Sequence, residues 1–214
     1  RTQRFIDISK RGLLPVPIRY YAAHTGRWGG DDKINLQNLP SRGPNAKALK
    51  RSIIAPEGHM IVEADSAQIE ARVLAWLAEQ EDLVTAFANK EDVYRKMASK
   101  IYGVQEEDVT KEQRFVGKTT ILGAGYGMGA PKFQLQLKSF GTDIELHEAQ
   151  RIIKIYREAN DMISKLWKDA NNSIKYMYQG SVLQFGRQGV LEVVDGGVRL
   201  PSGLVMRYDD LRGE

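Results

Sequence analysis

The sequence predicts an α+β fold with a mostly helical middle and two β regions. Apolar residues recur at steps of three and four through much of the range 67–178, which is the periodicity of amphipathic helices. After Gly180 the pattern changes to short apolar runs separated by glycine and proline turns, which is typical of antiparallel strands. A shorter apolar run, at 60–62, precedes the first of these helices and predicts the other β region.

Asp65 stands at the junction of the first predicted strand, 60–62, and the helix predicted at 67–78. A carboxylate at the C-terminal end of a buried strand can be presented to a cleft, which favours a functional role. Taken alone, however, an Asp before a helix is more simply explained as its N-cap.

The next elements are predicted to be helices. Thr110 and Gln113 have the spacing of a capping box, so a helix is expected to start at about Lys111. The longest periodic stretch runs over 148–178, with a break expected near Asn171-Asn172 and Trp167 in the core. The other helices are predicted at 82–90, 91–102 and 131–140. The strands after Gly180 are predicted at 182–185, 190–194, 198–200 and 204–208.

Composition excludes several classes of protein. The chain has 214 residues, of which 42% are hydrophobic and 27% charged, as in ordinary globular proteins. It has no cysteine, which excludes disulfides and thiolate metal sites. No apolar run approaches the roughly 18 residues of a membrane helix, so no membrane partner is expected. The net charge of +4 is compatible with a nucleic-acid partner.

The segment 114–127, RFVGKTTILGAGYG, carries the strongest functional signal. Its residues Arg114, Lys118, Leu122 and Tyr126 are four apart, so on a helix they drift by only about 40° per step and share one face. Two cations one turn apart suit a polyphosphate, and a ring beyond them can stack on a base. Taken alone, the segment is also explained as a basic surface helix that ends in a glycine turn.

Three segments together resemble the motifs of the family A DNA polymerases, most closely those of the phage and viral branch. They are HTGRWGG with NLQNLP at 24–40, DSAQIEAR at 65–72, and the segment 114–127. The resemblance covers nearly all of the chain and implies a right-hand polymerase fold. It assigns 1–85 to the first part of the palm, 86–180 to an inserted, mostly helical fingers subdomain, and 181–214 to a β-rich return toward the palm. The thumb is not among these segments.

The resemblance implies template-directed DNA synthesis. A primer 3′-hydroxyl attacks the α-phosphate of a deoxynucleotide, pyrophosphate leaves, and two Mg²⁺ ions stabilise the attacking and leaving oxygens. By motif match, Asp65 is the catalytic carboxylate that binds metal, together with the main-chain carbonyl of Ser66. Arg114 and Lys118 hold the triphosphate, and Lys118 also acts as a general acid toward pyrophosphate.

Other residues are assigned by the same match. Glu70 presses on the sugar edge and excludes a ribose 2′-hydroxyl, and Tyr126 occupies the template position until the new pair forms. Leu122 and Tyr94 also border the nucleotide. The residues expected toward the DNA duplex, where Asn, Gln and Arg can reach bases and sugars, are Arg27, Gln37, Asn38 and Gln68. The alternative for the 24–40 segment is a polar loop with Asx turns.

Three departures from the family pattern bear on function. The second metal carboxylate of the family belongs to a His-Asp-Glu-type motif, which residues 1–214 lack, so we expect a fragment that is inactive by itself. Leu122 replaces the usual Phe or Tyr beside the sugar, which predicts altered handling of 3′-modified nucleotides. Tyr94 replaces a phosphate-contacting His of many members, and a phenol cannot become cationic.

The expected partners are therefore primer–template DNA and deoxynucleoside triphosphates, in the cytoplasm of a bacterial or phage-infected cell. A processivity factor is compatible with this function, but the sequence identifies none. Two alternatives stay open: a truncated relative that grips primer–template without chemistry, and a helical DNA-binding regulator. The regulator would leave the Asp65 segment without a role.

Overall fold

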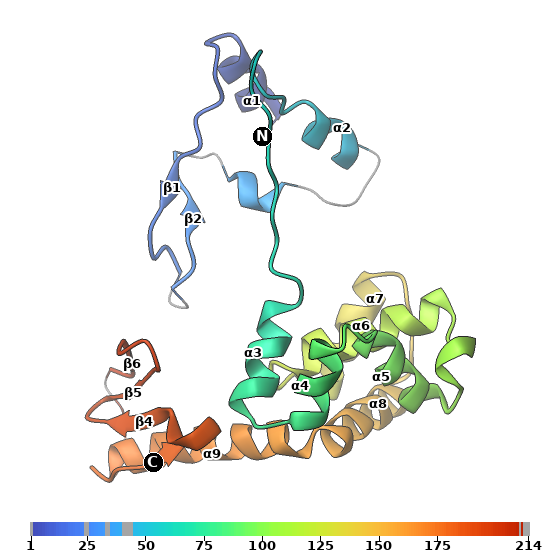
Figure 1. Ribbon diagram of the computed structural model, residues 1–214, viewed down its shortest axis with the longest axis vertical. Helices are drawn as coiled ribbons and strands as arrows, with labels where there is room; N and C mark the ends of the chain where they lie inside the picture. The colour runs from blue at the N-terminus through green and yellow to red at the C-terminus, as the bar shows by residue number, and fades with distance from the viewer. Residues whose placement is uncertain (1, 24–25, 33–34, 40–44, 210, 212–214) are drawn as a thin grey trace. The chain divides into compact units, whose positions relative to one another are not determined.

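The structure is a computed structural model that describes residues 2–23, 26–32, 35–39, 45–209 and 211. The chain forms two compact units, Arg1–Asp65 and Ser66–Glu214, and each is described by itself. Helices and antiparallel strands both occur, which confirms the predicted α+β class (Figure 1). The palm and fingers boundaries at 85/86 and 180/181 stay a prediction.

In its described residues, the first unit has two short helices and a small hairpin. The elements are α1 (Thr2–Ser9), β1 (Ile18–Arg19), β2 (Gly29–Gly30), the 3₁₀ turn η1 (Leu36–Asn38) and α2 (Ala46–Arg51). The strands pair antiparallel, with Ile18 opposite Gly30. His24, Thr25 and Pro40 of the first polymerase-like segment lie outside the described residues.

Helices dominate the second unit up to residue 178. They are α3 (Ile69–Leu77), α4 (Glu81–Ala88), α5 (Val93–Tyr102), the 3₁₀ turn η2 (Glu106–Asp108), α6 (Lys111–Ala124), α7 (Ala130–Ser139), α8 (Leu146–Ala159) and α9 (Asp161–Tyr178). The helices predicted near 67–78, 82–90, 91–102, 111 and 131–140 are thus confirmed within a few residues at each end.

A four-stranded antiparallel sheet follows, in the order β3-β4-β5-β6. Its elements are β3 (Gln184–Phe185), the 3₁₀ turn η3 (Arg187–Gly189), β4 (Leu191–Val194), β5 (Gly197–Arg199) and β6 (Val205–Arg207). Val194 pairs with Gly197, so Asp195 and Gly196 form a two-residue turn, and Gly196 takes a φ of +62°. Alternate residues of β4 are buried, which places one face of the sheet on a core.

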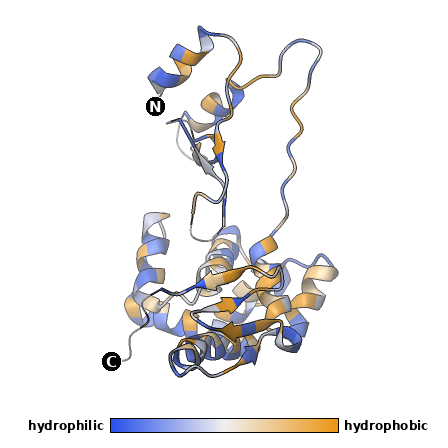
Figure 2. Ribbon diagram, turned by 90° about the vertical axis from the view of Figure 1, so that its left-hand side faces the viewer, coloured by the Kyte–Doolittle hydropathy of each residue, from blue (hydrophilic) through white to orange (hydrophobic). Residues whose placement is uncertain are grey.

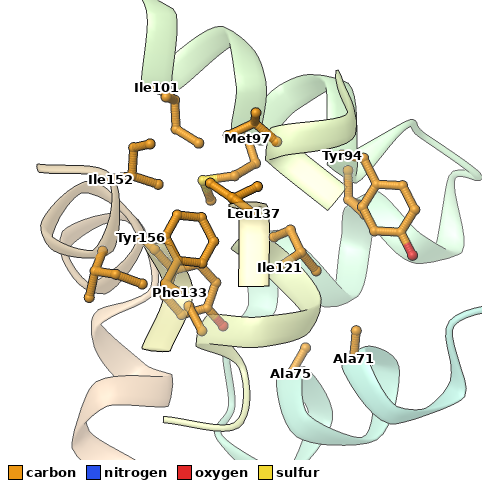
Figure 3. Close-up of a cluster of buried hydrophobic side chains, with 14 of the residues drawn as sticks. Ala71, Ala75, Tyr94, Met97, Ile101, Ile121, Phe133, Leu137, Ile152 and Tyr156 are labelled. Carbon is orange, nitrogen blue, oxygen red and sulfur yellow. The ribbon is translucent and has the colours of Figure 1, made fainter. Parts of the chain in front are cut away.

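The second unit has two hydrophobic clusters. The larger one joins the helices α3 to α8, and its most buried large side chains include Phe133, Leu137 and Tyr156 (Figure 3). The smaller one joins α9 to the sheet. Trp167 packs against both clusters and stacks on Tyr156 with ring centroids 6.2 Å apart. Its predicted place in the core is therefore confirmed.

The strand predicted at 60–62 is wrong. Residues 59–66 form no helix or strand, and Met60, Ile61 and Val62 are 82%, 60% and 81% exposed. In Figure 2 the trace leading into α3 alternates between hydrophobic and hydrophilic residues without forming an element. A strand needs hydrogen bonds from a neighbouring strand, and no described strand pairs with this segment. Asp65 therefore follows an extended coil rather than a buried strand.

The helix break predicted near Asn171-Asn172 is also wrong. Both residues lie inside α9, and the chain breaks at Asn160 instead, where φ is −132° and ψ is 59°. The buried Asn160 side chain donates from Nδ2 to the Tyr156 carbonyl oxygen at 2.9 Å. The backbone N–H of Asn160 donates to the same oxygen at 3.0 Å, so both groups of Asn160 hold the last turn of α8.

The backbones of helices α5 and α6 approach each other closely at Gly117. A Cβ atom at this position would lie 2.2 Å from the Tyr94 carbonyl oxygen and 2.9 Å from the Ala98 nitrogen. Both distances are shorter than side-chain atoms tolerate, and both partners are backbone atoms of α5 that cannot rotate away. Only glycine allows α6 to pack this closely on α5.

The substitution Gly117→Ala should therefore destabilise the protein by about 1–3 kcal/mol despite the better helix propensity of Ala, because α6 must move off α5. Chemical denaturation of both proteins measures this difference. Gly123→Ala in the same helix is the matched control, since its Cβ meets only flexible ends, the Gln136 oxygen at 3.3 Å and Met128 sulfur at 3.5 Å. Equal loss in both variants would contradict the packing argument.

Candidate active site

The start of α6 is fixed by its cap. Thr110 Oγ1 accepts from the Gln113 N–H at 3.2 Å, and Gln113 Oε1 accepts from the Thr110 N–H at 2.9 Å. This reciprocal pair is the predicted capping box, and it begins the helix at Lys111. Because Arg114 follows directly after the box, the cap sets where the cationic face of α6, formed by Arg114 and Lys118, begins.

Arg114 is held by a carboxylate that the sequence analysis missed. Its Nε donates to Asp92 Oδ2 at 2.6 Å. Asp92 is also the N-cap of α5, because its Oδ1 accepts from the Arg95 N–H at 3.1 Å. One signal in the sequence, an Asp before an apolar helix, could have identified the cap. The pairing with Arg114, 22 residues away, has no local signal.

The pKa of Asp92 lies below its ordinary value. Partial burial works to raise it, but the hydrogen bond from Arg114 and the Arg95 N–H together outweigh burial. Asp92 is therefore a carboxylate at neutral pH. Its negative charge stays beside the guanidinium of Arg114.

Tyr94 lies under both cations of the α6 face. The Arg114 guanidinium carbon is 5.4 Å from the centroid of the Tyr94 ring, and Lys118 Nζ is 5.9 Å from it. Both distances are within the range of cation–π attraction. Tyr94 itself is 7% exposed and belongs to the larger hydrophobic cluster, at whose edge Figure 3 shows it. The ring is thus a buried apolar support below the two cations.

The face predicted for 114–126 is only partly helical. α6 ends at Ala124, so Tyr126 lies in the following turn, which Gly127 closes with a φ of +72°. Tyr126 is 66% exposed, and its hydroxyl donates a hydrogen bond to Glu70 Oε2 in the first turn of α3. Leu122 is half-buried on the last turn of α6. The structure thus brings Glu70 and Tyr126 together at the end of this helix.

The start of α3 holds two other predicted residues. Gln68 precedes the helix in the left-handed region, with a φ of 58°, which is an uncommon conformation for a residue other than glycine. The Ser66 carbonyl oxygen accepts from the Ile69 N–H at 3.4 Å. Asp65, the last residue of the first unit, is exposed, and neither a side-chain hydrogen bond nor an ion pair joins it to another described residue.

The predicted DNA-side residues Arg27, Gln37 and Asn38 belong to the first unit. The Arg27 carbonyl accepts from the N–H groups of Ala22 and Ala23, at 2.9 and 3.3 Å, and so closes the hairpin between β1 and β2. Gln37 is exposed on η1, which also contains Asn38.

The sequence model of DNA polymerase family A matches residues 11–194, which is most of the chain. The chain belongs to DNA polymerase family A. DNA polymerase I of Pseudomonas aeruginosa is 37% identical to it over 147 residues, or 69% of this chain and 15% of that protein. The thermostable DNA polymerase I of Thermus aquaticus is 32% identical over 203 residues, or 95% of this chain and 22% of that protein.

A solved structure supports the same family membership. It is described as the POL domain of Pol1 from M. smegmatis in complex with DNA primer-template and dNTP. The similarity has a TM-score of 0.63 at 27% identity, and it covers 79% of this chain and 29% of that chain. All three family A relatives are bacterial, and none supports the expected phage or viral branch.

The family implies a divalent metal, and the described residues fit one side of such a site. They contain no group of three or more His, Asp or Glu side chains that could hold a metal ion. Mg²⁺ is commonly held by one or two carboxylates together with substrate phosphates and water. Asp65 is exposed and could offer one such carboxylate.

Among the described residues, no helix is long and apolar enough to cross a membrane.

The Asp92 carboxylate should make the free energy of unfolding depend on pH in the acid range. A carboxyl with a lower pKa in the folded protein contributes stability above its unfolded pKa, about 3.9. That contribution disappears as the pH falls through the lower folded value. Asp92→Asn keeps the cap but removes the charge, so it should lose less stability than the wild type between about pH 5 and pH 3. Denaturation midpoints across this range measure the effect.

Asp143→Asn is the matched control for this experiment. Asp143 pairs with Lys138 at 3.3 Å, but both side chains are well exposed, so the pair contributes little. Its acid sensitivity should match that of the wild type. An Asp92→Asn profile parallel to the wild-type profile would show that the Arg114 contact carries no stability.

Proposed function

We propose that the complete protein extends a DNA primer on a template, transferring a deoxynucleotide to the primer 3′-hydroxyl and releasing pyrophosphate. The observation that carries the proposal is the α6 face, where Arg114 and Lys118 share the Tyr94 ring and Tyr126 contacts Glu70 beyond the helix end. Membership of DNA polymerase family A supports it. The chain spans 15% and 22% of the two bacterial relatives, so the activity is proposed for the complete protein.

In this proposal Arg114 and Lys118 bind the triphosphate. A guanidinium and an ammonium one turn apart offer a directional donor set and a mobile point charge, which together match a polyphosphate. Lys118 is exposed, and its described partner is the Tyr94 ring rather than a carboxylate. It can therefore approach the leaving pyrophosphate and donate a proton to it as a general acid.

Asp65 and the Ser66 carbonyl are the proposed ligands from this chain for one of two Mg²⁺ ions. When bound, Mg²⁺ supplies charge stabilisation to the attacking and leaving oxygens. The chain's own part is to offer an exposed carboxylate directly before the turn into α3. No acid–base step is assigned to Asp65.

Glu70, Leu122 and Tyr126 are proposed to shape the nucleotide site. The Tyr126 hydroxyl holds the Glu70 carboxylate, which supports the proposed exclusion of a ribose 2′-hydroxyl by Glu70. Leu122 offers a branched apolar surface without a flat ring or a hydroxyl. The residues proposed to lie toward the DNA duplex are Arg27, Gln37, Asn38 and Gln68.

A non-catalytic module that only grips primer–template is the second candidate, because the described residues do not complete a metal site. A binder would need neither the exposed Asp65 nor a free Lys118 amine.

The proposed substrates are DNA and deoxynucleotides, so we place the reaction in the cytoplasm of a bacterial or phage-infected cell.

The substitution Asp65→Ala in the complete protein tests the function. Losing a metal-binding carboxylate should cost several kcal/mol of transition-state stabilisation, so extension should fall by at least about a thousandfold. Primer extension with Mg²⁺ measures this loss, and a gel shift should show primer–template binding retained. Glu63→Ala, an exposed acid two residues earlier, is the matched control and should extend normally. Extension by Asp65→Ala at the wild-type rate would refute the catalytic assignment, and a wild type that binds but never extends would favour the binder.

The substitution Leu122→Phe tests the sugar side of the proposed site. A flat ring there should change the ratio of dideoxynucleotide to deoxynucleotide incorporation and the rate of extension, because contact with the sugar edge changes. Competition assays with both nucleotides measure the ratio. Leu135→Phe, on the exposed face of α7, is the control for adding a ring elsewhere. An unchanged ratio and rate would exclude Leu122 from the sugar contact.

A further inference from the structure

We propose that Tyr94 is a positioning residue whose ring face holds Arg114 and Lys118 ready for the triphosphate, without touching the nucleotide itself. This inference rests on the proposed function. It is carried by one observation, that a single buried ring lies within 6 Å of both cations of the α6 face.

Two like charges one turn apart on a helix repel each other. Without a common partner, the long side chains of Arg114 and Lys118 would separate and sample many rotamers in water. The negative face of an aromatic ring attracts both cations at once. Tyr94 therefore reduces the rotamer freedom that a triphosphate would otherwise have to remove on binding.

The two cations depend on the ring unequally. Arg114 also contacts Asp92 at 2.6 Å, whereas Lys118 has no ion pair and no side-chain hydrogen bond with another described residue. Loss of the ring should consequently affect Lys118 more than Arg114. This asymmetry makes the inference testable through the coupling between Tyr94 and Lys118.

The ring itself is immobilised from below. Tyr94 is 7% exposed, and its carbonyl oxygen faces Gly117, where α5 and α6 approach each other closely. Asp92, two residues earlier, fixes the start of α5 as its N-cap. The position of the Tyr94 ring is therefore fixed by packing, and the side chains of Arg114 and Lys118 adopt rotamers that contact it.

The competing explanation is that the Tyr94 hydroxyl itself donates to a phosphate. This hydroxyl makes no hydrogen bond with another described residue, so the contacts of the free protein are compatible with that role too. The two explanations differ in which part of the side chain matters. The ring role depends on the π face, and the phosphate role depends on the oxygen atom.

The experiment is steady-state primer extension by the complete protein and its variants Tyr94→Phe and Tyr94→Leu. Tyr94→Phe keeps the π face and should leave the KM for the deoxynucleotide within about twofold of the wild type. Tyr94→Leu removes it and should raise KM about tenfold, as expected for losing two cation–π contacts, with kcat changed less than about threefold. Thermal unfolding of each variant separates this effect from loss of fold.

Phe87→Leu is the matched control. Phe87 is also a buried ring of the same cluster beneath an arginine, with the Arg72 guanidinium carbon 4.8 Å from its centroid, but it lies outside the α6 face. Its loss should lower the unfolding temperature and leave KM unchanged. A similar rise of KM in Phe87→Leu would show that core damage alone explains the Tyr94→Leu result, and would overturn the inference.

Tyr94→Phe alone decides the matter if Tyr94→Leu folds poorly, and a double-mutant cycle adds a second test if it folds well. A tenfold rise of KM in a stably folded Tyr94→Phe would assign the role to the hydroxyl and overturn the inference. Combining Tyr94→Phe or Tyr94→Leu with Lys118→Ala should show coupling for Leu only, since Phe keeps the ring. If the wild type extends no primer at all, the proposed function fails, whereas these outcomes arise only with an active wild type.

Discussion

The close contact of α5 with α6 at Gly117 determines the geometry of the candidate site. Because the Tyr94 carbonyl oxygen occupies the space that any other side chain at 117 would need, only glycine allows this separation of the two helices. Arg114 precedes this contact by less than one turn and Lys118 follows it directly, so both side chains emerge over the Tyr94 ring. The capping box then sets where α6 begins, and the Tyr126–Glu70 hydrogen bond ties the turn after it to α3.

Local signals made α6 predictable and left its partners unpredictable. The cap at Thr110 and the spacing of Arg114 and Lys118 depend on residues within a few positions of each other. The Asp92 contact and the shared ring depend on how two helices pack, which the periodicity of neither helix specifies. The helical fold and the cationic face could therefore be predicted from the sequence, but the support beneath that face could not.

The two wrong predictions have a common physical origin. The apolar run at 60–62 has the composition of a strand, but composition does not supply the neighbouring strand that would satisfy its backbone groups. The periodic pattern of apolar residues across 148–178 continues through Asn160, because α8 and α9, which meet there, both bury residues at helical spacing. The helices separate at the non-helical backbone of Asn160, whose side-chain amide bonds back to the Tyr156 carbonyl, and a change at one polar residue leaves the apolar pattern unchanged.

The contact with Asp92 orients Arg114 without using up its binding capacity. A guanidinium has five N–H donors, and the carboxylate engages only the Nε edge among the described contacts. The terminal nitrogens can therefore meet a phosphate while the ion pair stays in place. Asp92 does offset the charge of Arg114, so the net positive charge of the face comes mainly from Lys118. Arg114 thus contributes oriented hydrogen-bond donors and Lys118 contributes net positive charge. The helix spaces them one turn apart, and both side chains lie over the Tyr94 ring.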